Sequence, residues 1–250
     1  SFTIRLREAK KISLKGAVVP GTNITQIEAA QRSEIIKVQS YKIDLDVTTG
    51  AETFLVKTTI KFAGLKPGAT TFIDCVGNRV ISAKLNGADF DPKFDGETVF
   101  LPAIAADNTL EIEHEGIYSN SGEGLHRFVD PADNEVYLYS QGETAFIRKM
   151  YPCFDQPDLK ATFELTAIVP SHWEVVANNP LKEKKDLGNN RAQWSFTPTP
   201  RISTYITALV AGPYYSVKDT YVGKKTRVPR QNSVPARLKQ FAMPLSSPGH

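Results

Sequence analysis

The chain has 250 residues and a mass of 27.6 kDa, and 41% of its residues are hydrophobic, so it can form one large or two small domains with a true core. Sixteen glycines and sixteen prolines indicate many turns, and helix-favouring runs are scarce, so the composition indicates a β-rich globule and not a disordered chain. The net charge of +3 is unevenly spread, because residues 1–22 carry +4 and residues 221–250 carry +6, which leaves −7 for the body between them. The basic carboxy-terminal stretch is rich in proline, so we expect a solvated, poorly ordered end and no nucleic-acid partner.

The cysteine content favours a reduced protein. Cys75 and Cys153 are the two cysteines of the chain, which is too few for a disulfide framework. A cytoplasmic location is therefore expected. No stretch approaches the roughly 18–20 apolar residues that a membrane span requires, so no membrane partner is expected either. The first residues alternate charged and single apolar side chains, unlike the core of a signal peptide.

The first predicted element is a short helix that follows an irregular extension over residues 1–20. Thr25 and Glu28 have the spacing of a capping box, which predicts a helix over about residues 25–36. Four apolar residues are expected on one face of this helix, and these are Ile24, Ile27, Ala30 and Ile35.

Short strands are predicted through the rest of the chain. Apolar and polar residues alternate over 41–47 and 54–62, which buries one face of a sheet and exposes the other. Asn86-Gly87 favours a tight hairpin, because both residues can adopt a positive φ. Further strands are predicted at 99–101, 110–113, 136–139, 161–169, 173–177, 192–196, 205–210 and 214–218. The sequence therefore predicts an all-β, antiparallel sandwich with one short amino-terminal helix.

No catalytic motif is found in the chain. A zinc peptidase places two histidines four residues apart on a helix with a glutamate between them. His114-Glu115 begins this pattern, but the residue four positions after His114 is Tyr118, and the segment alternates like a strand. His114 is therefore interpreted as a strand-end histidine. The chain also lacks a nucleophilic G-x-S-x-G turn and a phosphate-binding loop, so no catalytic residue and no metal ligand is predicted.

Several ordered segments carry more information than these absent motifs. They are Gly124–Phe128, Tyr137–Glu143, Pro152–Ala161, Thr199–Tyr205 and Leu209–Pro213. In this order they resemble the amino-terminal domain of the aminopeptidase N family of gluzincin-type zinc aminopeptidases, especially its actinobacterial branch. The resemblance covers roughly residues 20–222. It implies a saddle-shaped β-sandwich that packs against a thermolysin-like zinc domain and forms one wall of the substrate pocket. Zinc belongs to the complete enzymes of that family, and no cofactor is expected in this chain.

The resemblance places Gln141 and Glu143 in the substrate-binding wall. An aminopeptidase must recognise a free α-ammonium group, which a carboxylate can pair with and an amide oxygen can accept a hydrogen bond from. Asp155-Gln156-Pro157-Asp158 is interpreted as a turn with aspartate caps. Arg148 could brace that turn or the pocket, and the sequence leaves both roles open.

The resemblance ends near Gly223, which divides the chain into an extension over 1–20, a β-domain over 21–222 and a divergent basic tail over 223–250. A shifted reading frame, an artificial boundary or a natural fusion would each account for the tail, and the first is preferred. We expect a substrate-anchoring fragment of a zinc aminopeptidase that is inactive alone, with the missing catalytic domain and, weakly, peptide amino termini as partners. The alternatives are a stand-alone module that binds peptide amino termini or a protein, and a hydrolase with a dispersed pair of carboxylates.

Overall fold

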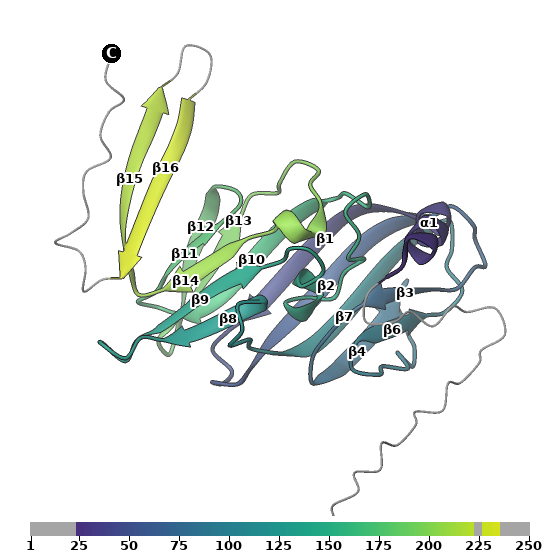
Figure 1. The fold of residues 1–250 in the computed structure, drawn as a ribbon, viewed down its shortest axis with the longest axis horizontal. Coiled ribbons are helices and arrows are strands. Elements are labelled where there is room, and N and C mark those ends of the chain that lie inside the picture. Colours follow the sequence, from purple (N-terminus) through teal and green to yellow (C-terminus); the bar gives the residue numbers. More distant parts are fainter. Residues whose placement is uncertain (1–23, 223–226, 236–250) are drawn as a thin grey trace, which may run out of the picture.

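A computed structural model describes residues 24–222 and 227–235, with side chains described through Val217. In this part of the chain one helix, α1 (Gln26–Ile35), precedes sixteen strands (Figure 1). Residues 1–20, expected to be an irregular extension, and most of the tail lie outside the described residues. The strands are β1 (Ile36–Asp46), β2 (Thr53–Gly64), β3 (Thr71–Asp74), β4 (Arg79–Leu85), β5 (Ala88–Asp89), β6 (Thr98–Leu101), β7 (Asp107–Ile117), β8 (Gly124–Val129), β9 (Val136–Gln141), β10 (Thr162–Pro170), β11 (Glu174–Ala177), β12 (Leu181–Gly188), β13 (Arg191–Phe196), β14 (Leu209–Gly212), β15 (Tyr214–Val222) and β16 (Arg227–Pro235).

The predicted capping box starts α1. The backbone N–H of Glu28 donates to the Thr25 hydroxyl at 3.2 Å, and the backbone N–H of Thr25 donates to the Glu28 carboxylate at 2.7 Å. The predicted apolar face is wrong for Ile27, which is 71% exposed, and for Ala30, which is also exposed, whereas Ile35 packs against the core. Glu28 and Arg32 are the buried residues of the helix, so a buried charge contributes to its attachment where an apolar stripe was expected.

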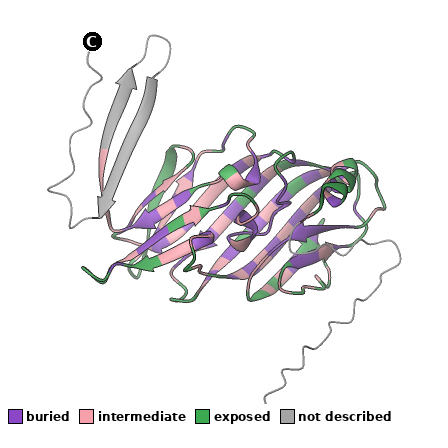
Figure 2. Cartoon of the chain, in the orientation of Figure 1, coloured by how far each residue is buried: buried purple, intermediate pink, exposed green. Residues whose placement is uncertain are grey.

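Two sheets form the body of the molecule, and their strands run in the orders β12-β13-β10-β1-β2-β7-β4-β5 and β11-β14-β9-β8. Tyr41 and Ile43 of β1 share one apolar core with Leu125 of β8 and Leu138 of β9, so the two sheets pack face to face. Buried residues alternate with exposed or half-buried ones along the strands, as the sequence predicts (Figure 2). The all-β fold is confirmed, with one departure from the antiparallel pattern: β1 pairs with β10 in parallel.

Local turn chemistry explains the connection between β4 and β5. Asn86 and Gly87 have φ values of 54° and 83° and join these two strands, which confirms the predicted hairpin.

His114 is not at a strand end as predicted: it lies inside β7 and is fully buried. Gly77 packs against its ring, because a Cβ at Gly77 would lie 2.1 Å from Nε2 of His114.

Two two-stranded sheets complete the described part of the fold. β3 pairs with β6 beside the larger sheet, and β15 pairs with β16 along their whole length. Residues 227–235 were expected to belong to a poorly ordered tail, and the structure instead places them in a strand. The ribbon of β15 and β16 projects from the body at the end where β11 and β14 lie (Figure 1).

Candidate functional site

The predicted site residues lie at the end of β9. Gln141 is the last residue of this strand, Glu143 follows two positions later, and both side chains are exposed. The backbone N–H of Glu143 donates to Oε1 of Gln141 at 3.2 Å. This bond links the Gln141 side chain to the Glu143 backbone. Glu143 lies beyond the end of β9, so the alternation of a strand does not determine the direction of its side chain. The peptide bond between Glu143 and Thr144 is cis.

Close packing fixes the loop at Gly142, which is buried between the two exposed residues. A Cβ at Gly142 would lie 2.8 Å from the carbonyl oxygen of Tyr205 and 3.2 Å from Cβ of Ile147, so a larger residue does not fit. The Gly142 carbonyl accepts a hydrogen bond from the backbone N–H of Phe146 at 3.0 Å. The loop therefore leads directly into the 3-10 turn η1 (Ile147–Lys149).

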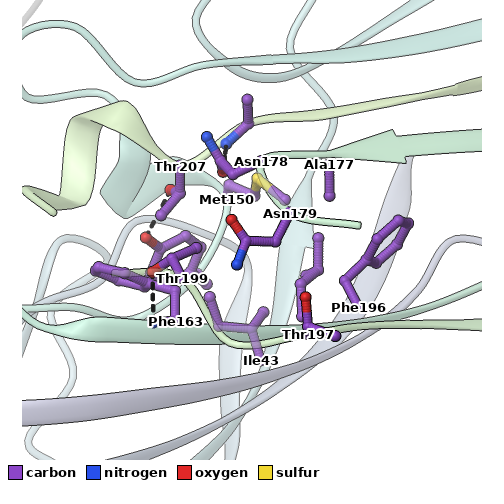
Figure 3. A pocket seen from close by; sticks show the side chains of 13 residues that line it. Ile43, Met150, Phe163, Ala177, Asn178, Asn179, Phe196, Thr197, Thr199 and Thr207 are labelled. Carbon is purple, nitrogen blue, oxygen red and sulfur yellow. Dashed lines mark hydrogen bonds between the residues drawn. The ribbon is translucent and has the colours of Figure 1, made fainter. Parts of the chain in front are cut away.

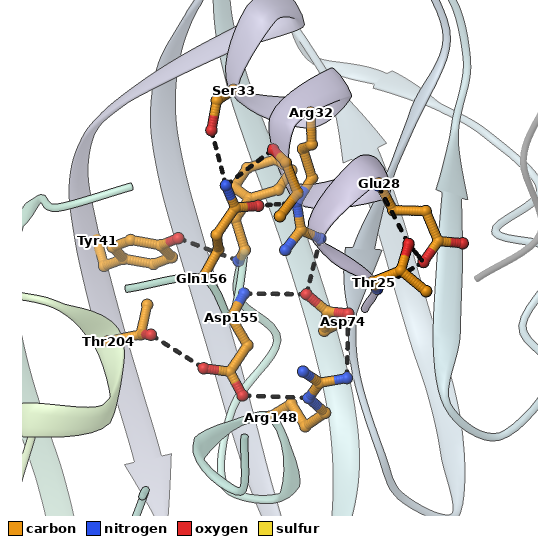
Figure 4. Close-up of polar contacts among 12 residues, drawn as sticks. Thr25, Glu28, Arg32, Ser33, Tyr41, Asp74, Arg148, Asp155, Gln156 and Thr204 are labelled. Carbon is orange, nitrogen blue, oxygen red and sulfur yellow. Dashed lines mark hydrogen bonds and ion pairs between the residues drawn. The ribbon is translucent and has the colours of Figure 1, made fainter. Parts of the chain in front are cut away.

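A buried charge cluster lies behind this loop and consists of Arg32, Asp74, Arg148 and Asp155 (Figure 4). Nη1 of Arg32 lies 2.8 Å from Oδ2 of Asp74. Arg148 bridges the two aspartates, with Nη1 at 3.3 Å from Asp74 and Nε at 3.1 Å from Asp155. All four side chains are at most 7% exposed, so the pairs are shielded from water.

Asp155 joins this cluster to the segment that packs on the site loop. Its Oδ1 accepts a hydrogen bond from the hydroxyl of Thr204 at 2.9 Å, and Thr204 precedes the Tyr205 backbone that contacts Gly142. Its backbone N–H donates to Asp74 at 2.9 Å. Burial raises the pKa of Asp155, and the positive charge of Arg148 opposes this shift. The Asp155 carboxylate thus connects Arg148 of η1, which follows the loop, with Thr204, whose neighbour Tyr205 packs on the loop.

Gln156 attaches helix α1 to the same segment. Its side-chain amide donates to the carbonyl of Ala29 at 2.9 Å and to the hydroxyl of Ser33 at 2.7 Å, and its oxygen accepts from Nε of Arg32 at 3.1 Å. Asp155 was predicted to cap a turn, whereas the structure buries it against Arg148. Of the two roles left open for Arg148, the structure shows the bracing one directly.

The outer face of the four-stranded sheet carries Gln141 and several aromatic rings. Leu125 and Leu138 point into the core, so the register pairs His126 with Tyr139 and Gly124 with Gln141 on the opposite face. The rings of His126 and Tyr139 lie 4.7 Å apart. Phe128 and Tyr139 are 46% and 40% exposed. This aromatic face, defined by His126, Phe128 and Tyr139, adjoins the Gln141–Glu143 loop.

A cavity lined by Met150 and Tyr151, which follow η1, is too small for a peptide. It has a volume of about 20 Å³ and is lined mainly by apolar side chains, including Ile43, Met150 and Phe163, with Asn178 and Thr207 among its polar lining residues (Figure 3). A cavity of this size holds about one water molecule. This cavity is therefore not a peptide-binding site, and Gln141 and Glu143 are not among its lining residues.

The described residues do not provide a zinc site. Within residues 24–222 and 227–235, no three histidine, cysteine, aspartate or glutamate side chains are grouped as metal ligands. His114 and His126 belong to different sheets, and burial lowers the pKa of His114 to about 4, so its imidazole is neutral. In the same described part, the helix is not long and apolar enough to cross a membrane.

Comparison with known proteins gives the family. The family model described as "Peptidase M1 N-terminal domain" matches residues 37–206. The chain is 44% identical over 216 residues to an aminopeptidase N of Streptomyces lividans, a match that covers 84% of this chain and 25% of that protein. It is 30% identical over 187 residues to a leucyl aminopeptidase of Saccharolobus solfataricus, covering 74% of this chain and 23% of that protein.

In a third relative, the matched region covers a larger share of the relative's length. An aminopeptidase N of Acetobacter pasteurianus is 33% identical over 133 residues, which cover 51% of this chain and 38% of that protein. The matched region thus spans about a quarter of the length of the first two relatives. Helix α1, the two packed sheets and the Gln141–Glu143 loop all lie in or next to the matched region. The chain therefore belongs to the aminopeptidase N family and carries its amino-terminal domain.

Proposed function

We infer that this chain is the substrate-anchoring amino-terminal domain of a zinc aminopeptidase that removes amino-terminal residues from peptides. The observation that carries this inference is the loop at the end of β9, where Gln141 and Glu143 are joined by a hydrogen bond and remain exposed. Zinc would be supplied by a catalytic domain outside the described residues. The two thiols, Cys75 and Cys153, are free and buried, which supports a reducing, cytoplasmic location.

The loop chemistry suits a free α-ammonium group. A carboxylate such as Glu143 forms a charge-assisted hydrogen bond with an ammonium donor. An amide oxygen has two lone pairs, so Oε1 of Gln141 can accept from the substrate while it accepts from the backbone N–H of Glu143. The buried Gly142 fixes the backbone between the two residues, because it packs against Tyr205.

The aromatic face is the surface on which we place the catalytic domain. Phe128 and Tyr139 expose apolar rings beside the loop, and clustered exposed rings are typical of a protein interface. A partner seated there would also enclose Glu143 in a drier pocket, where an ion pair is stronger than in water. The isolated chain would then bind amines weakly, because an exposed ion pair contributes only about 0–1 kcal/mol.

A chimera tests the anchoring function. Residues 24–222 would replace the matching segment of the aminopeptidase N of Streptomyces lividans, and hydrolysis of leucine p-nitroanilide would be measured. Glu143→Ala is expected to lower kcat/KM by tenfold or more, because a hydrogen bond to a charged group contributes about 1.5–3 kcal/mol. Glu183→Ala, which removes an exposed carboxylate of β12, is the matched control and should leave kcat/KM unchanged. Equal kcat/KM values for the chimera and its Glu143→Ala variant would remove Glu143 from the site.

A second measurement tests whether the isolated chain is catalytically active. The isolated 250-residue chain, supplied with zinc, is expected to release no p-nitroaniline from the same substrate. Turnover by the isolated chain would contradict the inference that catalysis needs another domain. Millimolar or tighter binding of leucine amide to the isolated chain would favour the alternative of a stand-alone module for amino termini.

A further inference from the structure

A groove opens between the two sheets at the end of the sandwich remote from α1. Helix α1 and the groove lie at opposite ends of β1, because α1 directly precedes this strand and Val47, which lines the groove, directly follows it. The groove has a volume of about 450 Å³, within the usual range of small-molecule sites. Its walls include Val47, Tyr118, Arg127, Leu138, Trp173 and Arg191.

Arg127 is half-buried in this groove without an acidic partner. It lies two residues after the fully buried Leu125 in β8 and opposite Leu138 of β9, so its side chain leaves the sheet on the inner face. Among the described residues it forms no salt bridge, and its ring contact is with Tyr118, whose centroid lies 6.0 Å from the guanidinium carbon. A partly desolvated cation of this kind gains stability from an incoming anion.

Arg191 adds a second guanidinium group from β13. Its Nη2 lies 2.7 Å from Oδ2 of Asp46, while its buried Nε has no hydrogen-bond partner among the described residues. Among the described residues that line the groove there is no aspartate or glutamate. Asp46 pairs with Arg191 alone, so the positive charge of Arg127 is not balanced by a salt bridge among the described residues, and the buried Nε of Arg191 is an unused donor.

We propose that this groove binds a carboxylate attached to an aromatic or aliphatic body. Arg127 would bind the carboxylate through its planar fork of N–H donors, a geometry that matches two carboxylate oxygens. Tyr118, Trp173 and Val47 provide the apolar wall for the body. A free organic acid and the carboxy-terminal residue of a peptide share this chemistry. The site is separate from the amine-binding loop and does not depend on the function proposed for it.

Titration of the full chain with 4-phenylbutyrate tests the proposal, with its neutral amide as the matched probe. Amide chemical shifts measured by NMR are expected to change around Tyr118 and Trp173, with a Kd near the millimolar range that is typical of a ligand of this size. The amide should bind at least tenfold more weakly. Acetyl-Gly-Phe with a free carboxylate, compared with 4-phenylbutyrate, tells whether a peptide end or a free acid binds better.

Two variants locate the charge that matters. Arg127→Gln is expected to weaken 4-phenylbutyrate binding at least tenfold, and its thermal midpoint should stay close to that of the parent chain because the variant loses the ring contact with Tyr118 but no ion pair. Lys37→Gln removes an exposed positive charge at the start of β1 and should bind like the parent chain. Equal binding by the acid and its amide, an unchanged Kd in Arg127→Gln, or no shift change at the solubility limit of the probe would each overturn the proposal.

Discussion

The buried charge cluster and the Gln141–Glu143 loop both use carboxylates, but in opposite surroundings. Asp74 and Asp155 are almost fully buried and each is paired with arginine. Glu143 is exposed and has no salt bridge among the described residues. A buried charge must be paired inside the protein or its desolvation cost is not offset, whereas an exposed carboxylate remains hydrated and can still bind a ligand. The cluster therefore has a structural role, whereas the exposed Glu143 carboxylate is free for the recognition that we propose.

Removing one member of the cluster should give the largest loss of stability. Asp155→Ala is expected to lower the free energy of unfolding by about 3–5 kcal/mol, because it leaves Arg148 partly uncompensated and removes the partner of Thr204. Urea unfolding followed by circular dichroism measures this change. A loss below about 1 kcal/mol would show that the cluster contributes little to the difference between the two regions.

Acid should destabilise the chain through His114. Its pKa is about 4 in the folded state because of burial, against about 6.5 in the unfolded chain, so the unfolded state binds the extra proton between these values. The contribution is fully present above pH 6.5 and is lost as the pH falls toward 4, to a total of about 3 kcal/mol. Urea midpoints between pH 4 and 7 measure it.

The control for this pH dependence is His114→Gln, which removes the titrating ring and keeps a polar side chain. The variant should lose part of the slope between pH 4 and 6.5 even if its stability at pH 7 is lower. Identical slopes in the two chains would assign the acid sensitivity to carboxylates instead, with Asp155 excluded because a raised pKa acts in the opposite direction.

Gly142→Ala should have an intermediate effect and connects the two regions. The added methyl group would lie 2.8 Å from the Tyr205 carbonyl, so backbone must shift and about 1–3 kcal/mol of stability is expected to be lost. At Gly50 a Cβ would meet nothing closer than 3.7 Å, so Gly50→Ala is the matched control. Thermal unfolding distinguishes them, and equal midpoints would mean that the loop is not fixed by its contact with Tyr205.

Glu143→Ala in the isolated chain should give the smallest effect. The side chain is exposed and lies outside the cluster, so the free energy of unfolding is expected to change by less than about 0.5 kcal/mol. Urea unfolding of Glu143→Ala and Asp155→Ala under the same conditions compares the two losses of unfolding free energy. A loss comparable to that of Asp155→Ala would mean that Glu143 stabilises the fold, and the separation between the two regions would fail.

Local patterns predicted most of the strands and the start of α1, because alternation along 41–47 and the pairing of Thr25 with Glu28 depend on nearby residues. The charge cluster could not be predicted this way, since Arg32 and Asp155 are distant in sequence and polar residues are usually exposed. The parallel pairing of β1 with β10 was missed for the same reason. Gln141 and Glu143 were identified from the family resemblance, and no local pattern would have separated them from other surface residues.

The parallel partnership of β1 and β10 also has a consequence for synthesis on the ribosome. β1 can pair with β2 as soon as residues 53–64 have emerged, but its other edge waits for residues 162–170. At about 5–20 residues per second this wait lasts roughly ten seconds. During that interval the nascent chain presents an unpaired strand edge, with an apolar residue at alternate positions along most of its length, with which other chains can pair. Proper folding of this domain is therefore completed only late in its own translation.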